Sequence, residues 1–178
     1  MNAYLLLANG MVFAGQSVGA EGVTVGEVVF ATGMVGFQET LTDPSYYGQI
    51  ITQTYPLIGN YGVNHEDNES SRPWAEAFIV RHLARRGSNF RCEDGLDSYL
   101  KQFHITGIEG VDTRALTRIL RSQGTMNGMI TCAEHFSVPE CLERIRAYRV
   151  EGTVERVTRK EPQVYPAAGG QQLRVALM

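Results

Sequence analysis

Residues 26–64 read GEVVFATGMVGFQETLTDPSYYGQIITQTYPLIGNYGVN, and this stretch decides the fold. It includes most of a strand-like run over 23–32 and all of a second run over 49–55. A Thr-Asp-Pro-Ser-Tyr turn separates the two runs, and a glycine-rich segment follows them. Pro44 fixes its own φ, and Asp43 can accept hydrogen bonds from the backbone N–H groups ahead of it. No nucleophile–base pair is visible here. The stretch therefore either presents a surface to a partner or makes a difficult chain reversal.

Upstream of this stretch, two apolar runs over 3–8 and 11–18 are separated by Asn9-Gly10. Asn-Gly between such runs is typical of a type I′ hairpin turn, because both residues tolerate positive φ. The sequence therefore predicts an N-terminal antiparallel β-hairpin. Gly26, inside the next strand, is interpreted as a β-bulge.

Downstream, strand-like and helix-like segments alternate, which indicates a mixed α/β or α+β domain. The expected segments are strands over 75–80, 104–108 and 128–132, and helices over 96–103, between Asp112 and Gly124, and from Ser137 to about Tyr148. Asp112 can cap the second of these helices. Ser137 and Glu140 have the spacing of a capping box for the third. The third helix is expected to bury Val138, Leu142 and Ile145.

The last part of the chain has a different composition. Residues 150–172 are rich in charges, prolines and glycine, and this pattern indicates a linker. Residues 173–178, LRVALM, begin to resemble a strand that has no partner after it. We therefore expect a domain over 1–149, a linker over 150–172, and at 173–178 the start of a further domain.

Length and composition exclude several classes of protein. A chain of 178 residues with 43% hydrophobic and 20% charged residues is expected to form one globular domain. The net charge of −3 does not favour a nucleic-acid or membrane-surface partner. No apolar run reaches the roughly 20 residues of a membrane span, and the N-terminus lacks the basic region of a signal peptide. Three cysteines without close pairing favour a reduced, cytoplasmic protein.

The cysteines and histidines do not form a recognisable site. None of the cysteines lies in a Gly-x-Cys-x-Gly elbow, so each is interpreted as a small structural hydrophobe. The histidines have no metal-ligand spacing, and no metal site is expected. These residues are Cys92, Cys132 and Cys141, and His65, His82, His104 and His135.

Three further features each allow two interpretations. The residues from Gly59 to Gly62 could offer backbone N–H groups to a phosphate, or simply make a turn. Arg114, Arg118 and Arg121 share one helix face, which is either solvated or a charged contact for a partner chain. Ser45 is either a local backbone capper or a hydroxyl presented to a ligand. No activating base lies near Ser45 in sequence, so a serine hydrolase is not supported.

The stretch over 26–64 resembles the N-terminal domain of the small subunit of carbamoyl phosphate synthase. Further motifs carry the same resemblance: ESS at 69–71, SNFR at 88–91 and GIEGVDTRALTRILRSQGTMNGMI at 107–130. The resemblance covers about residues 3–132. In addition, LRVALM at 173–178 resembles the first strand of the glutaminase domain of this family. The departures are small: Ala31, Gly33 and Phe37 stand where the family often has Asn, Ser and Tyr.

The resemblance implies a compact β/β/α domain of the swivelling type that packs against a large subunit and against its own C-terminal glutaminase domain. In the complete enzyme, a Cys-His-Glu triad of that glutaminase releases ammonia from glutamine. The large subunit then joins the ammonia to bicarbonate using ATP, for arginine and pyrimidine synthesis. The present chain stops before the glutaminase half. We therefore expect no catalytic residue and no cofactor in this domain, with ATP and magnesium in the large subunit, and no activity of this chain alone.

One functional residue follows from the resemblance. In the family, the serine of the Thr-Asp-Pro-Ser-Tyr turn contacts bound glutamine, and this position is Ser45 here. The alternative to this role is a stand-alone interaction or ligand-binding module that shares the fold without glutaminase activity.

Overall fold

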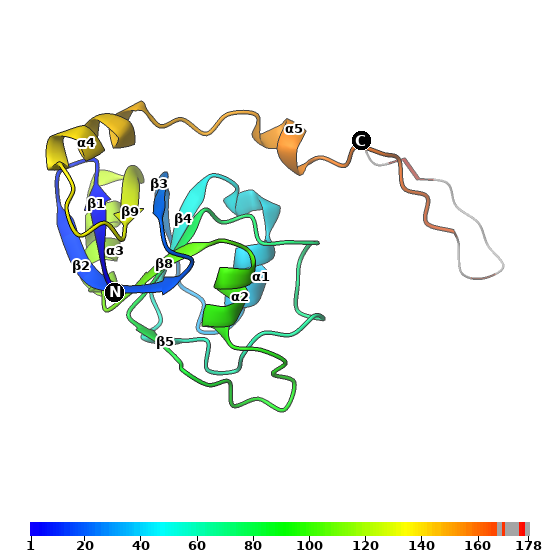
Figure 1. Ribbon diagram of the computed structural model, residues 1–178. Helices are drawn as coiled ribbons and strands as arrows, with labels where there is room; N and C mark the ends of the chain where they lie inside the picture. Colours follow the sequence, from blue (N-terminus) through cyan, green and yellow to red (C-terminus); the bar gives the residue numbers. More distant parts are fainter. Residues whose placement is uncertain (167–168, 170–174, 177–178) are drawn as a thin grey trace.

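The computed structural model describes residues 1–166, 169 and 175–176. Within these residues, seven strands form a closed barrel in the order β1-β2-β8-β6-β4-β3-β9 (Figure 1). Their bounds are β1 Asn2–Leu7, β2 Val12–Gly19, β3 Val23–Ala31, β4 Gln49–Gln53, β6 Ala77–Val80, β8 Thr106–Glu109 and β9 Met126–Thr131. Antiparallel pairing of β1 with β9 closes the barrel. The pairs β3–β4, β4–β6 and β6–β8 are parallel.

Short helices surround the barrel, and a small parallel sheet of β5 (Leu57–Ile58) and β7 (His82–Leu83) lies beside it. The helices are α1 Phe37–Thr42, the 3-10 turn η1 Pro44–Tyr46, α2 Leu96–Gln102, α3 Thr113–Gln123, α4 Val138–Ala147 and α5 Thr153–Val157. In Figure 1, α1 and α2 lie together on one side of the barrel, and the chain leads from α4 away towards α5. This arrangement confirms the mixed α/β class. None of the helices in the described part of the chain is long and apolar enough to cross a membrane.

The core consists of two main apolar clusters on opposite faces of the strands. One contains Leu5, Val28 and Ile50 together with Leu116 and Leu120 of α3. The other contains residues of β4, α1 and α2, namely Ile51, Phe37, Leu41, Leu96 and Leu100. Because successive side chains of a strand point to opposite faces, β4 contributes Ile50 to one cluster and Ile51 to the other. This explains why β4 has two apolar residues in succession and no strict alternation.

The N-terminal hairpin is confirmed, but its turn is not type I′. Gly10 has a φ of 88°, whereas Asn9 is not among the non-glycine residues with positive φ. The N–H of Gly10 donates to the carbonyl of Leu7 at 2.9 Å, and the side chain of Asn9 accepts from the N–H of Met11 at 3.0 Å. A single glycine in the left-handed conformation at the end of the turn is typical of a three-residue hairpin loop. The forward bond of Asn9 to Met11 is the kind that asparagine makes in turns.

The bulge expected at Gly26 is also absent. Gly26 pairs in continuous register with Gly128 of β9, between the pairs Val25–Met129 and Glu27–Asn127. A Cβ atom at Gly26 would lie 2.8 Å from Cγ1 of Ile50. The glycine therefore allows a close approach of neighbouring residues and does not break the ladder.

The C-terminal third differs from expectation in several ways. The side chain of Ser137 makes no capping hydrogen bond, and α4 buries Cys141 and Ile145, whereas Val138 is 37% exposed and Leu142 is half-buried. The predicted linker contains α5. The predicted strand over 173–178 lies outside the described residues, apart from 175 and 176, which are in no strand.

Candidate functional site

Ser45 lies in a single 3-10 turn directly after α1. Pro44 occupies the first position of the turn, and the Oδ1 atom of Asp43 accepts the N–H of Ser45 at 2.8 Å. The N–H of Tyr47 donates to the carbonyl of Pro44 at 3.1 Å and closes the turn. The predicted forward bond of Asp43 is thus confirmed, and a pre-set proline makes the turn rigid.

The capping in this turn comes from Asp43 and not from Ser45. Ser45 is exposed, and its hydroxyl takes part in none of the hydrogen bonds found among the described residues. A capping serine would bond its hydroxyl to nearby backbone. The geometry therefore leaves this hydroxyl available to a group outside the chain.

The loop over residues 69–74 holds the start of the Ser45 turn in place. The hydroxyl of Thr42 accepts the N–H of Glu69 at 2.9 Å, and the hydroxyl of Ser70 donates to the carbonyl of Thr42 at 2.5 Å. The indole Nε1 of Trp74 donates in turn to Ser70 Oγ at 2.8 Å. These bonds fix the last residue of α1, and so they fix the residue from which the turn begins.

The other end of the turn is fixed by the C-terminal segment. The hydroxyl of Tyr148, just after α4, donates to the carbonyl of Gly48 at 3.1 Å. Burial, with a contribution from the nearby carboxylate of Glu76, raises the pKa of Tyr148 to about 12. Its phenol is therefore a neutral donor at physiological pH. Ser45 is consequently held between two anchored points, Thr42 and Gly48.

Sequence reasoning found Asp43 and Ser45 but missed α1, Thr42 and Trp74. Helix α1 has only six residues and begins at Gly36, which has a φ of 82° and offers no capping side chain. It forms because Phe37 and Leu41 are buried, so tertiary packing and not local propensity stabilises it. In the sequence, Ser70 is indicated only by the ESS motif at 69–71, which is one of the motifs of the family resemblance.

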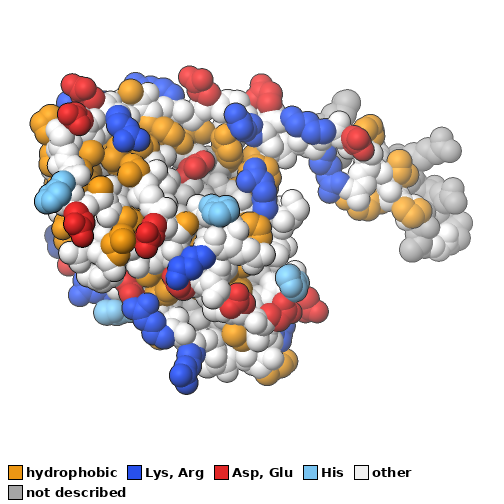
Figure 2. All heavy atoms as spheres, in the orientation of Figure 1, with side chains coloured by type: hydrophobic (Ala, Val, Ile, Leu, Met, Phe, Trp, Pro, Cys, Tyr) orange, Lys and Arg blue, Asp and Glu red, His pale blue; other side chains and the backbone are white. Residues whose placement is uncertain are grey.

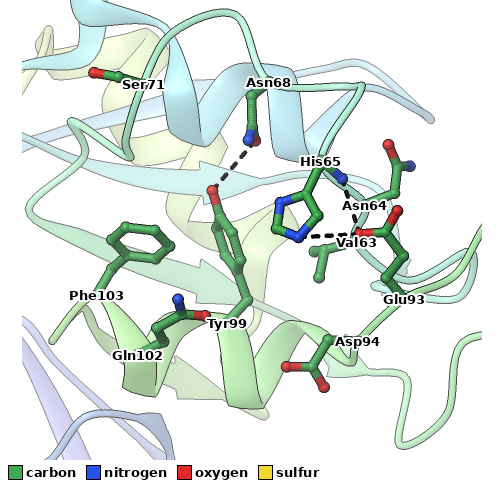
Figure 3. A pocket seen from close by; sticks show the side chains of 10 residues that line it. All are labelled: Val63, Asn64, His65, Asn68, Ser71, Glu93, Asp94, Tyr99, Gln102 and Phe103. Atoms are coloured by element: carbon green, nitrogen blue, oxygen red, sulfur yellow. Dashed lines mark hydrogen bonds and ion pairs between the residues drawn. The ribbon is translucent and has the colours of Figure 1, made fainter.

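The cavity shown in Figure 3 lies elsewhere, between α2 and the loops at 63–71 and 93–94. It has a volume of about 410 Å³. Its polar groups are largely paired within the chain: Asn64 with Gln38, His65 with Glu93, and Tyr99 with Asn68. Burial raises the pKa of Tyr99 to about 12, so this phenol is also neutral at physiological pH. The cavity contains no nucleophile beside a base, and its polar contacts serve to hold the loops.

The cysteines and histidines are dispersed over the structure. Cys132 and Cys141 are buried, Cys92 is half-buried, and all three are free thiols. Among the described residues, no three His, Cys, Asp or Glu side chains are close enough to bind a metal ion. His82 on β7, His104 after α2 and His135 between β9 and α4 are exposed, and the side chain of His65 is 93% exposed beside Glu93.

The glycines at 59 and 62 make a structural turn. Both have positive φ, and the N–H of Gly62 donates to the carbonyl of Gly59 at 3.0 Å. A Cβ at Gly62 would lie 2.1 Å from the sulfur of Cys92. The N–H of Val63 donates to the carbonyl of Asp94. Within the segment from Gly59 to Gly62, the N–H of Gly62 is therefore already used, and the N–H of Val63 directly after it is used as well.

The three arginines do lie on one side of α3. Arg114, Arg118 and Arg121 are exposed and line a surface cavity of about 480 Å³. Three threonines complete its lining, namely Thr32 after β3, Thr54 after β4, and Thr117 of α3. The arrangement offers guanidinium and hydroxyl donors to an anionic group.

Comparisons with known proteins assign the family. The family model described as "Carbamoyl-phosphate synthase small chain, CPSase domain" matches residues 5–130. The chain belongs to this carbamoyl-phosphate synthase small chain family. A small chain from Clostridium perfringens is 50% identical over 161 residues, which cover 90% of this chain and 46% of that protein. One from a Nostoc species is 54% identical over 147 residues, covering 83% of this chain and 38% of that protein.

A small chain from a Synechococcus species is 58% identical over 129 residues, covering 72% of this chain and 33% of that protein. The chain thus spans less than half the length of these relatives. Among solved structures, an aminopeptidase from Aneurinibacillus matches 72% of this chain and 30% of that chain, with a TM-score of 0.40 and 15% identity. That similarity is too low to support an argument.

Proposed function

We propose that this chain is the N-terminal domain of a carbamoyl phosphate synthase small subunit. In the complete enzyme, the small subunit supplies ammonia from glutamine for the synthesis of carbamoyl phosphate from bicarbonate and ATP. The proposal is supported by the family match over residues 5–130 and by the small-chain names of the relatives. The short coverage of those relatives supports the role of one domain in a larger subunit.

The role of this domain is to dock onto the large subunit and to complete the glutamine site of the adjoining glutaminase domain. The exposed Ser45 hydroxyl, on a turn held at Thr42 and Gly48, carries this proposal. A hydroxyl that is presented rigidly and is not used within the chain can hydrogen-bond a polar substrate at low entropic cost. The domain contributes binding contacts and no catalytic group.

Several finer properties belong to the same proposal. The complete enzyme is a ligase with glutamine amidotransferase activity, in arginine and pyrimidine biosynthesis, and works as a cytoplasmic heterodimer. ATP and magnesium bind in the large subunit. The proposal also takes the domain to be the compact β/β/α swivelling-type domain of this family, and its compact mixed α/β architecture supports this.

Replacement of Ser45 by alanine tests the glutamine role. In the complete small subunit paired with its large subunit, Ser45→Ala should raise the KM for glutamine roughly tenfold, because a hydrogen bond to a polar substrate contributes on the order of 1–2 kcal/mol. Synthesis from added ammonia should be unchanged, since it bypasses the glutamine site. The measurement is carbamoyl phosphate formation from each nitrogen source.

Ser98→Ala is the matched control, because Ser98 is an exposed serine on α2. It should leave both activities unchanged. If Ser45→Ala lowers the two activities together, Ser45 acts through the structure of the domain and the glutamine role is refuted.

A further inference from the structure

The arginine row of α3, defined as Arg114, Arg118 and Arg121, has no ionic partner among the residues that the structure describes. No carboxylate lines the cavity beside it, where the remaining positions are threonines. Like charges four residues apart destabilise a helix. The pair Arg114 and Arg118 is thus unfavourable for α3 itself, and an anionic group from outside the chain would compensate for it.

The spacing of the arginine row favours an extended partner over a small ion. Arg121 lies seven positions after Arg114, which is about 10 Å along a helix axis. One small oxyanion can contact only neighbouring guanidinium groups at that spacing. Carboxylates repeated along a protein segment match all three.

Exposed apolar residues adjoin the cavity in sequence and favour a protein surface. Thr32 is followed by Met34 and Val35, which are 67% and 75% exposed, and Thr54 is followed by Tyr55, which is 38% exposed. Large apolar side chains beside arginines are typical of protein–protein interfaces. A site that binds only a small free anion does not require exposed apolar residues next to it.

We propose that the arginine row docks an acidic segment of the large chain of carbamoyl phosphate synthase. The inference rests on the proposed function, and it assigns the docking surface to α3 and the ends of β3 and β4. Guanidinium groups pair with the carboxylates, and the hydroxyls of Thr32 and Thr54 add hydrogen bonds, whereas that of Thr117 already donates to the carbonyl of Thr113. The apolar residues form the drier part of the contact.

Charge reversal at the centre of the row tests the proposal. The complete small chain carrying Arg118→Glu should bind the purified large chain at least roughly tenfold more weakly than wild type in isothermal titration calorimetry, because like charges then face each other. Arg144→Glu is the matched control. It reverses an exposed arginine on α4 and should leave the affinity unchanged. Thermal unfolding of both variants checks that they remain folded.

The outcomes separate this inference from the proposed function. If wild type does not bind the large chain, both are overturned. If wild type binds and Arg118→Glu binds equally well, only the arginine-row inference is overturned. If inorganic phosphate binds wild type but not Arg118→Glu while the affinity for the large chain is the same for both, the row is a site for a small anion and the docking role is refuted.

Discussion

Ser70, and not Ser45, is the serine on which the local structure depends. Its hydroxyl donates to the carbonyl of Thr42 and accepts the indole N–H of Trp74, so it joins the end of α1 to the loop between β5 and β6. The guanidinium of Arg72 covers the same indole at 3.7 Å. The support at the Thr42 end of the Ser45 turn therefore depends largely on this one small side chain.

Ser70→Ala should destabilise the domain by about 1–3 kcal/mol, because it leaves the indole N–H of Trp74 and the carbonyl of Thr42 without their partner. The measurement is urea unfolding followed by fluorescence, since Trp74 is the single tryptophan of the chain. Ser45→Ala serves as control and should change the free energy of unfolding by less than about 0.5 kcal/mol. Equal losses in the two variants would contradict the division between a structural and a presented serine.

The sequence was informative about this site only where the contacts are local. Asp43 bonds to a residue two positions away, and such turn chemistry is visible in a short window. The bond from Ser70 to Thr42 spans 28 residues, and that from Tyr148 to Gly48 spans 100. Nothing in residue spacing predicts contacts at those separations.

At the level of elements, two helices with similar capping signals differ in the structure. The carboxylate of Asp112 accepts the N–H of Ala115 at 3.0 Å and caps α3. Ser137 makes no such bond at the start of α4, although its sequence has the capping-box form. The two helices therefore allow a paired test of what a cap contributes.

Asp112→Ala should cost about 0.5–2 kcal/mol of stability, the usual range for loss of an N-cap. Ser137→Ala should cost clearly less, because no hydrogen bond is lost. Both values come from chemical denaturation under identical conditions. A larger loss for Ser137→Ala than for Asp112→Ala would show that the cap of α4 forms in solution and would contradict the structure.

The elements that were predicted well are those with a long periodic pattern or with clear residues that start and end the element. Helix α3 has a capping aspartate, a regular apolar face and Gly124 at its end, and its bounds follow from these signals. The burial expected for α4 is confirmed for Ile145 and wrong for Val138, because Cys141 packs with Leu6 and Met129 in its place. The short strands β5 and β7 have only two residues each and give no periodicity to detect.

For the whole molecule, the contacts of Tyr148 and Val150 with Gly48 lie at the predicted domain boundary. The hydroxyl of Tyr148 bonds to the carbonyl of Gly48, and Val150 packs so closely that a Cβ on Gly48 would lie 2.7 Å from it. A cut at residue 149 removes the second of these contacts. The structural unit therefore extends at least through Val150.

A chain that ends at Gly152 should keep the Tm of the 178-residue chain to within about 2 °C, since it retains both contacts. A chain that ends at Ala147 should unfold several degrees lower, because for a domain of this size each kcal/mol lost lowers Tm by about 2–4 °C. Differential scanning calorimetry of the three chains provides the comparison. Equal Tm values for all three would show that the segment after α4 does not stabilise the domain.

The global arrangement was predictable only in part. The hairpin and the later alternation of strands and helices indicated the mixed class, because each depends on local patterns. The pairing of β1 with β9 was not foreseen, since it joins Tyr4 to Thr131 and Leu7 to Gly128. Alternation within a strand indicates which face is buried and says nothing about its neighbour.

The same closure has a consequence for the order of events during synthesis on the ribosome. The first strand completes its hydrogen bonding only with a strand that ends at Thr131, so nearly the whole domain must emerge before the sheet can close. Until then β1 has an open edge, which is a template for pairing with other chains. Contacts so distant in sequence also slow folding. During synthesis, one edge of the N-terminal hairpin therefore stays unpaired until β9 has been made.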